Sequence, residues 1–121
     1  MREKVKQFLL GFKEIASRKG VIFIRRADSL ETLRFLGLTK ANLEESLLSL
    51  SVGDYCEGPH LDHSGIGEVW IFGKILKGIE VYIKLKIIDP EAVKCISFHI
   101  SKCPLSYPFK GADTLSHSEE E

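Results

Sequence analysis

Four side chains that could act on a phosphate alternate with apolar residues in the segment 78–88. They are Glu80, Tyr82, Lys84 and Lys86. Because successive side chains of a β-strand point to opposite faces, these four are expected to stand in one row, with the apolar residues between them facing a core. A phenol and two ammonium groups on one surface can orient a phosphate and stabilise negative charge on it. The row therefore predicts a phosphate-binding surface.

Neighbouring strands are expected to add to this row. On the strand before it, Trp70, Phe72 and Lys74 would point outward if Val69, Ile71 and Ile75 face the core. On the strand after it, Ser97 and His99 would join the same face. Aromatic planes interleaved with cations suit single-stranded nucleic acid, whose bases stack while its phosphates pair with ammonium groups. Two plainer interpretations remain: alternating lysines can serve only solubility, and the loop or the "PLSYPF" segment could cover the two aromatic residues.

The loop before these strands contains a cluster of two histidines and an aspartate: His60, Asp62 and His63. Together with His99 they could bind a metal, although the spacing matches no well-defined metal motif. Histidine also exchanges protons near neutral pH, so these side chains are candidates for acid–base chemistry. No Gly-rich phosphate loop, nucleophile elbow or H-E-x-x-H motif occurs in the sequence.

The composition is that of a single globular domain. Of the 17 acidic residues, four follow residue 110, where no Lys or Arg occurs, so residues 1–110 carry a net charge of +4. No apolar run approaches the roughly 20 residues of a membrane span, and the first 20 residues lack the pattern of a signal peptide. The three cysteines form no paired CxxC motif, which favours a reducing cytoplasm.

The elements that must position these residues follow from periodicity and caps. Apolar residues at intervals of three and four predict a helix over 3–18, and residues 21–24 read as a short strand. Ser29 is expected to cap a second helix, which ends at Gly37. Thr39 is expected to cap a third helix, and Asn42 is not expected to complete its capping box. Residues 51–67 read as a loop. Segments 68–76, 79–88 and 92–100 read as strands, joined by turns at 77–78 and 89–90.

The predicted fold is therefore α+β. N-terminal helices would pack on a C-terminal three-stranded antiparallel β-meander, with a short extra strand near 21–24. Residues 1–110 would form the domain, its last part from 101 packing on the body, and 111–121 a polar, acidic, disordered tail.

Four short motifs carry a resemblance to a known family: "DYCEGP", "VWIFGK", "EVYIKLK" and "ISFH". With the residues around them, from about 30 to 109, they resemble the MqsR-type toxins of bacterial type II toxin–antitoxin systems, in the RelE-like group of mRNA interferases. The resemblance implies a toxin that cuts mRNA without the ribosome and without a metal or other cofactor. It also implies a cognate antitoxin with a zinc-binding and a DNA-binding domain.

The resemblance also assigns residues. The strand tyrosine and lysine of the family correspond to Tyr82 and Lys84, and the basic residue near the end of the last strand to His99. The family's loop carries a lysine shortly after the Asp–aromatic pair, whereas here Cys56 and Glu57 follow that pair. This altered loop and a longer tail indicate a separate branch, in which catalytic roles are expected to be redistributed onto His60, His63 or His99.

The sequence thus predicts that His99 transfers a proton, Tyr82 orients the phosphate or donates a proton, and Lys84 stabilises charge, with His63 as a further catalytic candidate. RNA would be bound by four more residues: Lys74, Lys86, Trp70 and Glu80. Two alternatives remain open. One is a non-catalytic module that binds RNA or protein; the other is a metal-dependent nuclease using His60, Asp62, His63 and His99.

Overall fold

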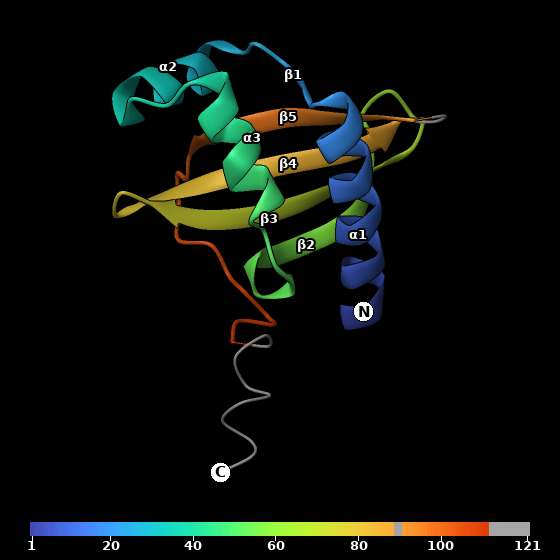
Figure 1. Cartoon of the computed structure of the whole chain (residues 1–121). Helices are drawn as coiled ribbons and strands as arrows, with labels where there is room; N and C mark the ends of the chain where they lie inside the picture. The colour runs from blue at the N-terminus through green and yellow to red at the C-terminus, as the bar shows by residue number, and fades with distance from the viewer. Residues whose placement is uncertain (89–90, 112–121) are drawn as a thin grey trace.

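The computed structural model describes residues 1–88 and 91–111, and in this part of the chain helices precede and cover a β-sheet (Figure 1). The helices and strands, in chain order, are α1 (Arg2–Lys19), β1 (Ile22–Phe23), α2 (Ala27–Leu36), α3 (Lys40–Leu48), a 3-10 turn η1 (Val52–Asp54), β2 (Tyr55–Leu61), β3 (Glu68–Leu76), β4 (Ile79–Ile88) and β5 (Ala92–Ile100). The predicted turn at 89–90 and the tail from 112 onward lie outside the described residues.

The strands form one mixed sheet in the order β1-β5-β4-β3-β2. Strands β2 to β5 are antiparallel neighbours, and β1 runs parallel to β5 at the opposite edge. The α+β class is confirmed, but the sheet has five strands and the predicted meander has three. The predicted strands 68–76, 79–88 and 92–100 are confirmed to the residue.

Strand β2 was predicted to be loop, and that prediction was wrong. Its sequence has the composition of a loop, and its pairing with β3 is interrupted by register shifts on either side of Glu57. Gly58 has a φ of 116°, and a Cβ there would lie 3.0 Å from the carbonyl oxygen of Val69. Pairing with β3 therefore makes this segment a strand, although its own composition is that of a loop.

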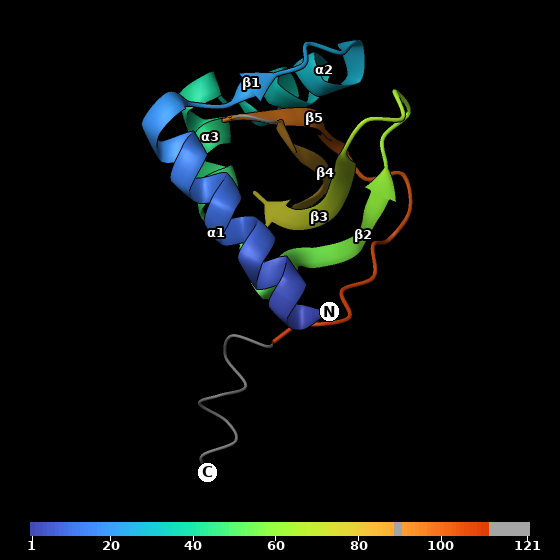
Figure 2. The same ribbon diagram turned by 90° about the vertical axis from the view of Figure 1, so that its right-hand side faces the viewer.

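Helices α1 and α3 cover one face of the sheet, as expected. The buried side chains of α1 recur at helical spacing and include Val5, Phe8, Phe12 and Ile15. Figure 2 shows the strands curving around these helices, with the segment 101–111 on the outer side of β2 and β3. The face of the sheet that carries Tyr82 and Lys84, turned away from α1 and α3, is called the open face below.

Helix α2 begins three residues earlier than predicted, with Arg26 in place of Ser29 at the N-cap. Ser29 is therefore not a cap: its buried side-chain oxygen accepts a hydrogen bond from the backbone N–H of Phe98 at 3.1 Å. Thr32 accepts one from Ile100 in the same way, at 3.2 Å. Since β1 is only two residues long, these hydroxyls satisfy donors of β5 that β1 does not reach.

The predicted N-terminus of α3 is confirmed, with one correction. Thr39 is the N-cap, and its hydroxyl accepts from the N–H of Asn42 at 3.1 Å. The Asn42 side chain accepts in return from the N–H of Thr39 at 3.0 Å. An amide oxygen thus completes the capping box that was expected to stay incomplete.

The two faces of β3 are the reverse of those predicted. Trp70 and Phe72 lie opposite Leu85 and Ile83 of β4 and face the helices; they are 7% and 0% exposed. Ile75, predicted to be buried, is 59% exposed. The alternation was ambiguous because β3 is buried and apolar on both faces over 69–72.

Strand β5 follows the prediction only in its second half. Phe98 faces the core, and Ser97 and His99 lie on the open face, opposite Lys84 and Tyr82. A register shift after Lys84 leaves Ile96 without a partner in the pairing with β4. This bulge inverts the alternation before it, so that Cys95 is buried in the core and Lys94 lies opposite Lys86, contrary to prediction.

Candidate functional site

The polar row of β4 stands on the open face, as the alternation predicted. Lys84 lies opposite Ile71 of β3 and Ser97 of β5, and Tyr82 lies opposite Gly73 and His99. The row does not act as one unit, however. Its two end residues are held by other parts of the chain, and its two central residues border a hollow.

Glu80, at one end of the row, is bound to the segment 101–111. Its carboxylate accepts hydrogen bonds from the N–H of Leu105 at 3.1 Å and the hydroxyl of Tyr107 at 2.7 Å. Burial, and then the bond to Glu80, raise the pKa of Tyr107. Gly73 provides the space, since a Cβ at that position would clash with Tyr107 and Leu105. The predicted packing of this segment on the body is confirmed, and RNA binding by Glu80 remains a prediction.

Lys86, at the other end, holds the loop between β2 and β3. Its side chain is largely buried, and its ammonium donates to Asp62 Oδ2 at 2.5 Å and to the carbonyl oxygen of Ile66 at 2.7 Å. A phosphate would have to displace these partners. The contacts give Lys86 a second role, that of fixing the loop that carries His63.

The ion pair between Asp62 and Lys86 is expected to make stability depend on pH in acid. The hydrogen bond from Lys86, ahead of any other cause, lowers the pKa of Asp62 from 3.8 to about 2. Since the folded-state pKa is depressed, the contribution is complete above about pH 3.8 and is lost as the pH falls toward about 2. Thermal unfolding of the wild type and of Asp62→Asn should differ at neutral pH and converge near pH 2. A difference independent of pH would contradict this account.

Tyr82 and His99 form a stacked pair across β4 and β5. Their ring centroids lie 4.9 Å apart, with 15° between the planes. Burial, and then the negative charge of Glu57, raise the pKa of Tyr82. Its hydroxyl is therefore protonated at neutral pH and can donate a hydrogen bond.

The hydrogen bonds of His99 set its tautomer. Nδ1 lies 2.9 Å from the carbonyl oxygen of Ile100, which can only accept, so Nδ1 carries the proton. Nε2 is then the basic nitrogen of the neutral ring, and Asp28 Oδ2 lies 4.0 Å from it. Asp28 therefore places a carboxylate beside the nitrogen that is free to accept a proton.

A hollow of about 210 Å³ adjoins the other side of Tyr82. Its lining joins β4 to β2, β3 and the loop between them: Glu57, His60, Leu61, His63, Val69, Ile71, Tyr82 and Lys84. Within it His60 Nε2 and Glu57 Oε1 lie 2.8 Å apart. The structure therefore brings together the four predicted catalytic residues. On one side of β4, His99 of β5 stacks on Tyr82. On the other side, His63 lines the hollow together with Tyr82 and Lys84.

Two of the predicted RNA-binding residues are not on the open face. Trp70 stacks on Phe8 of α1, with ring centroids 4.8 Å apart. Lys74 lies opposite Val81, a core residue, and its ammonium is 3.7 Å from Asp54 Oδ2. Their predicted placement beside Tyr82 was wrong, because it depended on the reversed faces of β3.

With this geometry established, the chain was compared with known proteins. No family model, curated protein or solved structure matches it. The resemblance to MqsR-type toxins therefore remains a prediction from the motifs.

The loop cluster predicted as a metal alternative is not assembled. Asp62 is engaged by Lys86 and His60 by Glu57. Within residues 1–88 and 91–111, no three His, Cys, Asp or Glu side chains are grouped closely enough to hold a metal ion. Across the same residues, no helix has the length and hydrophobicity needed to cross a membrane.

Three residues near the site were not predicted from the sequence. Arg26 donates to the hydroxyl of Ser97 at 3.4 Å, Asp28 faces His99, and Glu57 lines the hollow. For Arg26 and Asp28 the available signal was "RRAD" immediately after the short strand 21–24. Parallel pairing of β1 with β5 brings that segment to the open face, and this pairing was not evident from the sequence.

Cys56 lies in strand β2, in the stretch of sequence where the MqsR-type toxins that the motifs resemble carry a lysine. Burial, followed by the charges of Glu57 and Glu80, raises the pKa of its thiol to about 12. The thiol is therefore neutral at physiological pH and cannot replace the positive charge of a lysine.

Proposed function

We propose that this protein is a metal-independent endoribonuclease that cuts mRNA in the cytoplasm and acts as the toxin of a type II toxin–antitoxin system. One observation carries the proposal: imidazoles approach Tyr82 and Lys84 from both sides of β4, His99 from β5 and His63 from the loop between β2 and β3. The resemblance of the motifs to MqsR-type toxins points to the same chemistry.

The reaction is attack of a ribose 2′-hydroxyl on the adjacent phosphorus. The hydroxyl proton passes to Nε2 of His99, the new O–P bond closes a 2′,3′-cyclic phosphate, and the bond to the 5′-oxygen breaks. His63, from the opposite side of β4, gives a proton to the leaving 5′-oxygen. Attacking and leaving oxygens stand on opposite sides of phosphorus, so a base and an acid on opposite sides of the phosphate site suit this displacement.

Tyr82 and Lys84 lie beneath the phosphate in this scheme. The protonated Tyr82 hydroxyl donates a hydrogen bond to a non-bridging oxygen, and the Lys84 ammonium stabilises the negative charge of the transition state. Asp28 lies beside Nε2 of His99, and the bonds of Lys86 to the loop position His63. The roles of Asp28 and Lys86 use contacts in which these residues already take part.

The antitoxin belongs to the same proposal. It is expected to have a zinc-binding and a DNA-binding domain, so DNA would be contacted only through this partner. Strands β1 and β2 form the two edges of the sheet, and an edge strand offers backbone groups with which a partner chain can pair. The antitoxin would neutralise the toxin by binding it stably.

The purified protein is expected to cut single-stranded RNA in the presence of excess chelator, at a rate equal to that without chelator. The reason is that side chains supply the base, the acid and the positive charge. Gel analysis of RNA fragments, with and without chelator, measures this. Loss of cleavage on chelation that added divalent metal restores would overturn the metal-independent mechanism.

Binding of RNA without cleavage under any of these conditions would favour the alternative, a non-catalytic module. The observation that favours this alternative is in strand β2, where Cys56 is neutral and Glu57 adds a negative charge beside the hollow.

A further inference from the structure

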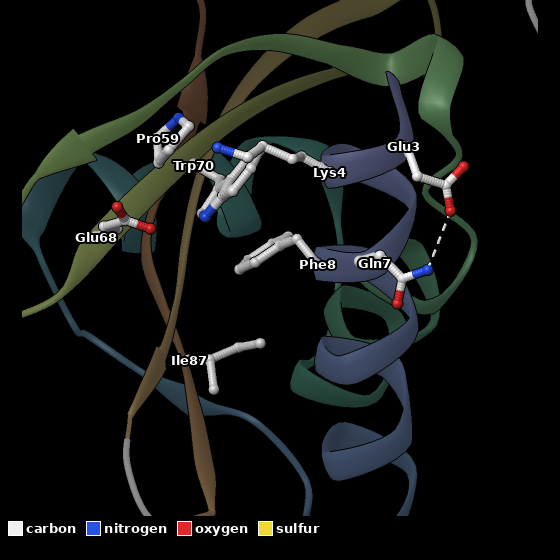
Figure 3. Close-up of a pocket in the computed structure, with 8 residues that line it drawn as sticks. All are labelled: Glu3, Lys4, Gln7, Phe8, Pro59, Glu68, Trp70 and Ile87. Atoms are coloured by element: carbon white, nitrogen blue, oxygen red, sulfur yellow. Dashed lines mark hydrogen bonds between the residues drawn. The ribbon is translucent and has the colours of Figure 1, made fainter. Parts of the chain in front are cut away.

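A second hollow lies on the opposite, helix-covered side of the sheet. It measures about 460 Å³ and opens between the first turns of α1 and strands β2 and β3 (Figure 3). Its apolar lining comes from Phe8, Pro59, Trp70 and Ile87. Small-molecule sites typically have volumes of about 300–1,000 Å³ and walls dominated by apolar and aromatic groups.

Trp70 gives this hollow a directed polar group. The side chain is more than nine-tenths buried, and its indole N–H has no hydrogen-bond acceptor among residues 1–88 and 91–111. In that part of the chain no fully buried side-chain nitrogen or oxygen lacks a partner, so this nitrogen retains some accessible surface. Figure 3 shows it turned toward the space between Glu68 and Phe8. A ligand with an acceptor at this point would take the place of water at a donor that has no protein partner.

Charged side chains stand at the rim of this hollow. Lys4 and Glu68 line the hollow, both are exposed, and neither forms an ion pair with another described residue. The third charged residue, Glu3, accepts a hydrogen bond from Gln7 at 3.1 Å. Glu68 can turn into solvent, whereas the indole N–H is fixed in the wall. The fixed donor in the wall therefore sets the polarity of the ligand, and Lys4 can pair with a negative group placed there.

We propose that this hollow binds a small aromatic carboxylate. The aromatic ring would pack against Phe8, Trp70 and Pro59, and the carboxylate would accept from the indole N–H of Trp70 and pair with Lys4. The Phe8 and Trp70 rings, inclined by 19° to each other, already form a stacked pair in the wall. The site does not depend on the proposed RNA cleavage, which takes place on the other face of the sheet.

The single tryptophan of the chain makes the test direct. Its indole N–H gives one resonance in a ¹H–¹⁵N spectrum of the full-length protein. Titration with 3-phenylpropionate should shift this resonance progressively and to saturation. The alcohol and the amine with the same body, 3-phenylpropan-1-ol and 3-phenylpropylamine, should bind more weakly, in that order.

Two lysines of one helix provide a matched pair of variants. Lys4→Gln should weaken binding of 3-phenylpropionate about twofold to fivefold, the range for an exposed charge pair, while Lys6→Gln, which does not line the hollow, should leave it unchanged. The dispersion of the same spectra shows whether each variant is folded. The proposal is overturned if the indole resonance stays in place at every ligand concentration up to about 10 mM, which is well above the dissociation constant expected of a fragment. It is also overturned if the amine binds best, or if both lysine variants behave alike.

Discussion

Replacing Tyr82 by Phe, or His99 by Gln, is expected to lower the rate of RNA cleavage by about a hundredfold or more, the scale on which removal of an acid–base group acts. Tyr82→Phe keeps the stacked ring and removes only the hydroxyl that would contact the phosphate. His99→Gln keeps a polar side chain but removes the nitrogen that would take the proton. Initial cleavage rates on one RNA, at saturating substrate, measure both effects.

Tyr107→Phe is the matched control for the tyrosine variant. It also removes one hydroxyl from the open-face side of the sheet, but that hydroxyl is bonded to Glu80 and lies outside the hollow. Cleavage should stay within about twofold of wild type, while stability falls by about 1 kcal/mol, as for the loss of one hydrogen bond. If Tyr82→Phe and His99→Gln both kept full cleavage, the catalytic assignment would be wrong, and the Glu57–His60 pair would be the next candidate.

Phe72→Ala is expected to lower the free energy of unfolding by about 3–5 kcal/mol, the usual cost of deleting a fully buried phenyl ring. Phe72 is fully buried and stacks on Phe8, with ring centroids 6.0 Å apart. Ile75→Ala, on the same strand but largely exposed, should change the free energy by no more than about 0.5 kcal/mol. Urea denaturation of the two variants measures this.

The pair tests which face of β3 packs against the helices. The sequence pattern alone predicts the opposite ranking, with Ile75 buried and Phe72 exposed. A larger loss for Ile75→Ala than for Phe72→Ala would mean that the observed register between β3 and β4 is incorrect.

The alternation predicted β4 correctly because only one of its faces carries polar residues. Strand β3 carries apolar residues on both faces over 69–72, so a period of two identified a strand without telling which side faces the helices. In β5 the bulge at Ile96 inverts the alternation, and a bulge leaves no reliable trace in the sequence. Local composition likewise predicted loop for β2, where pairing with β3 decides the structure.

The centre of the candidate site could be predicted, and its surroundings could not. Tyr82, Lys84 and His99 follow from alternation on adjacent strands and from the motif resemblance. The partners of Glu80 and Lys86 come from segments 20 to 27 residues away in the sequence. Those contacts depend on how the loop and the segment 101–111 fold back. Asp28 depends in the same way on the packing of α2 against β5.

The measurement that tests the central claim most directly compares two oligonucleotides. One is an RNA that the protein cuts at a single position; the other differs only in a 2′-deoxyribose on the 5′ side of that position. The account predicts that the RNA is cut to a 2′,3′-cyclic phosphate and a 5′-hydroxyl end, and that the deoxy oligonucleotide is bound but stays intact, because the attacking oxygen is missing. Cleavage of the deoxy oligonucleotide at the same position, or fragments with a 5′-phosphate, would contradict it.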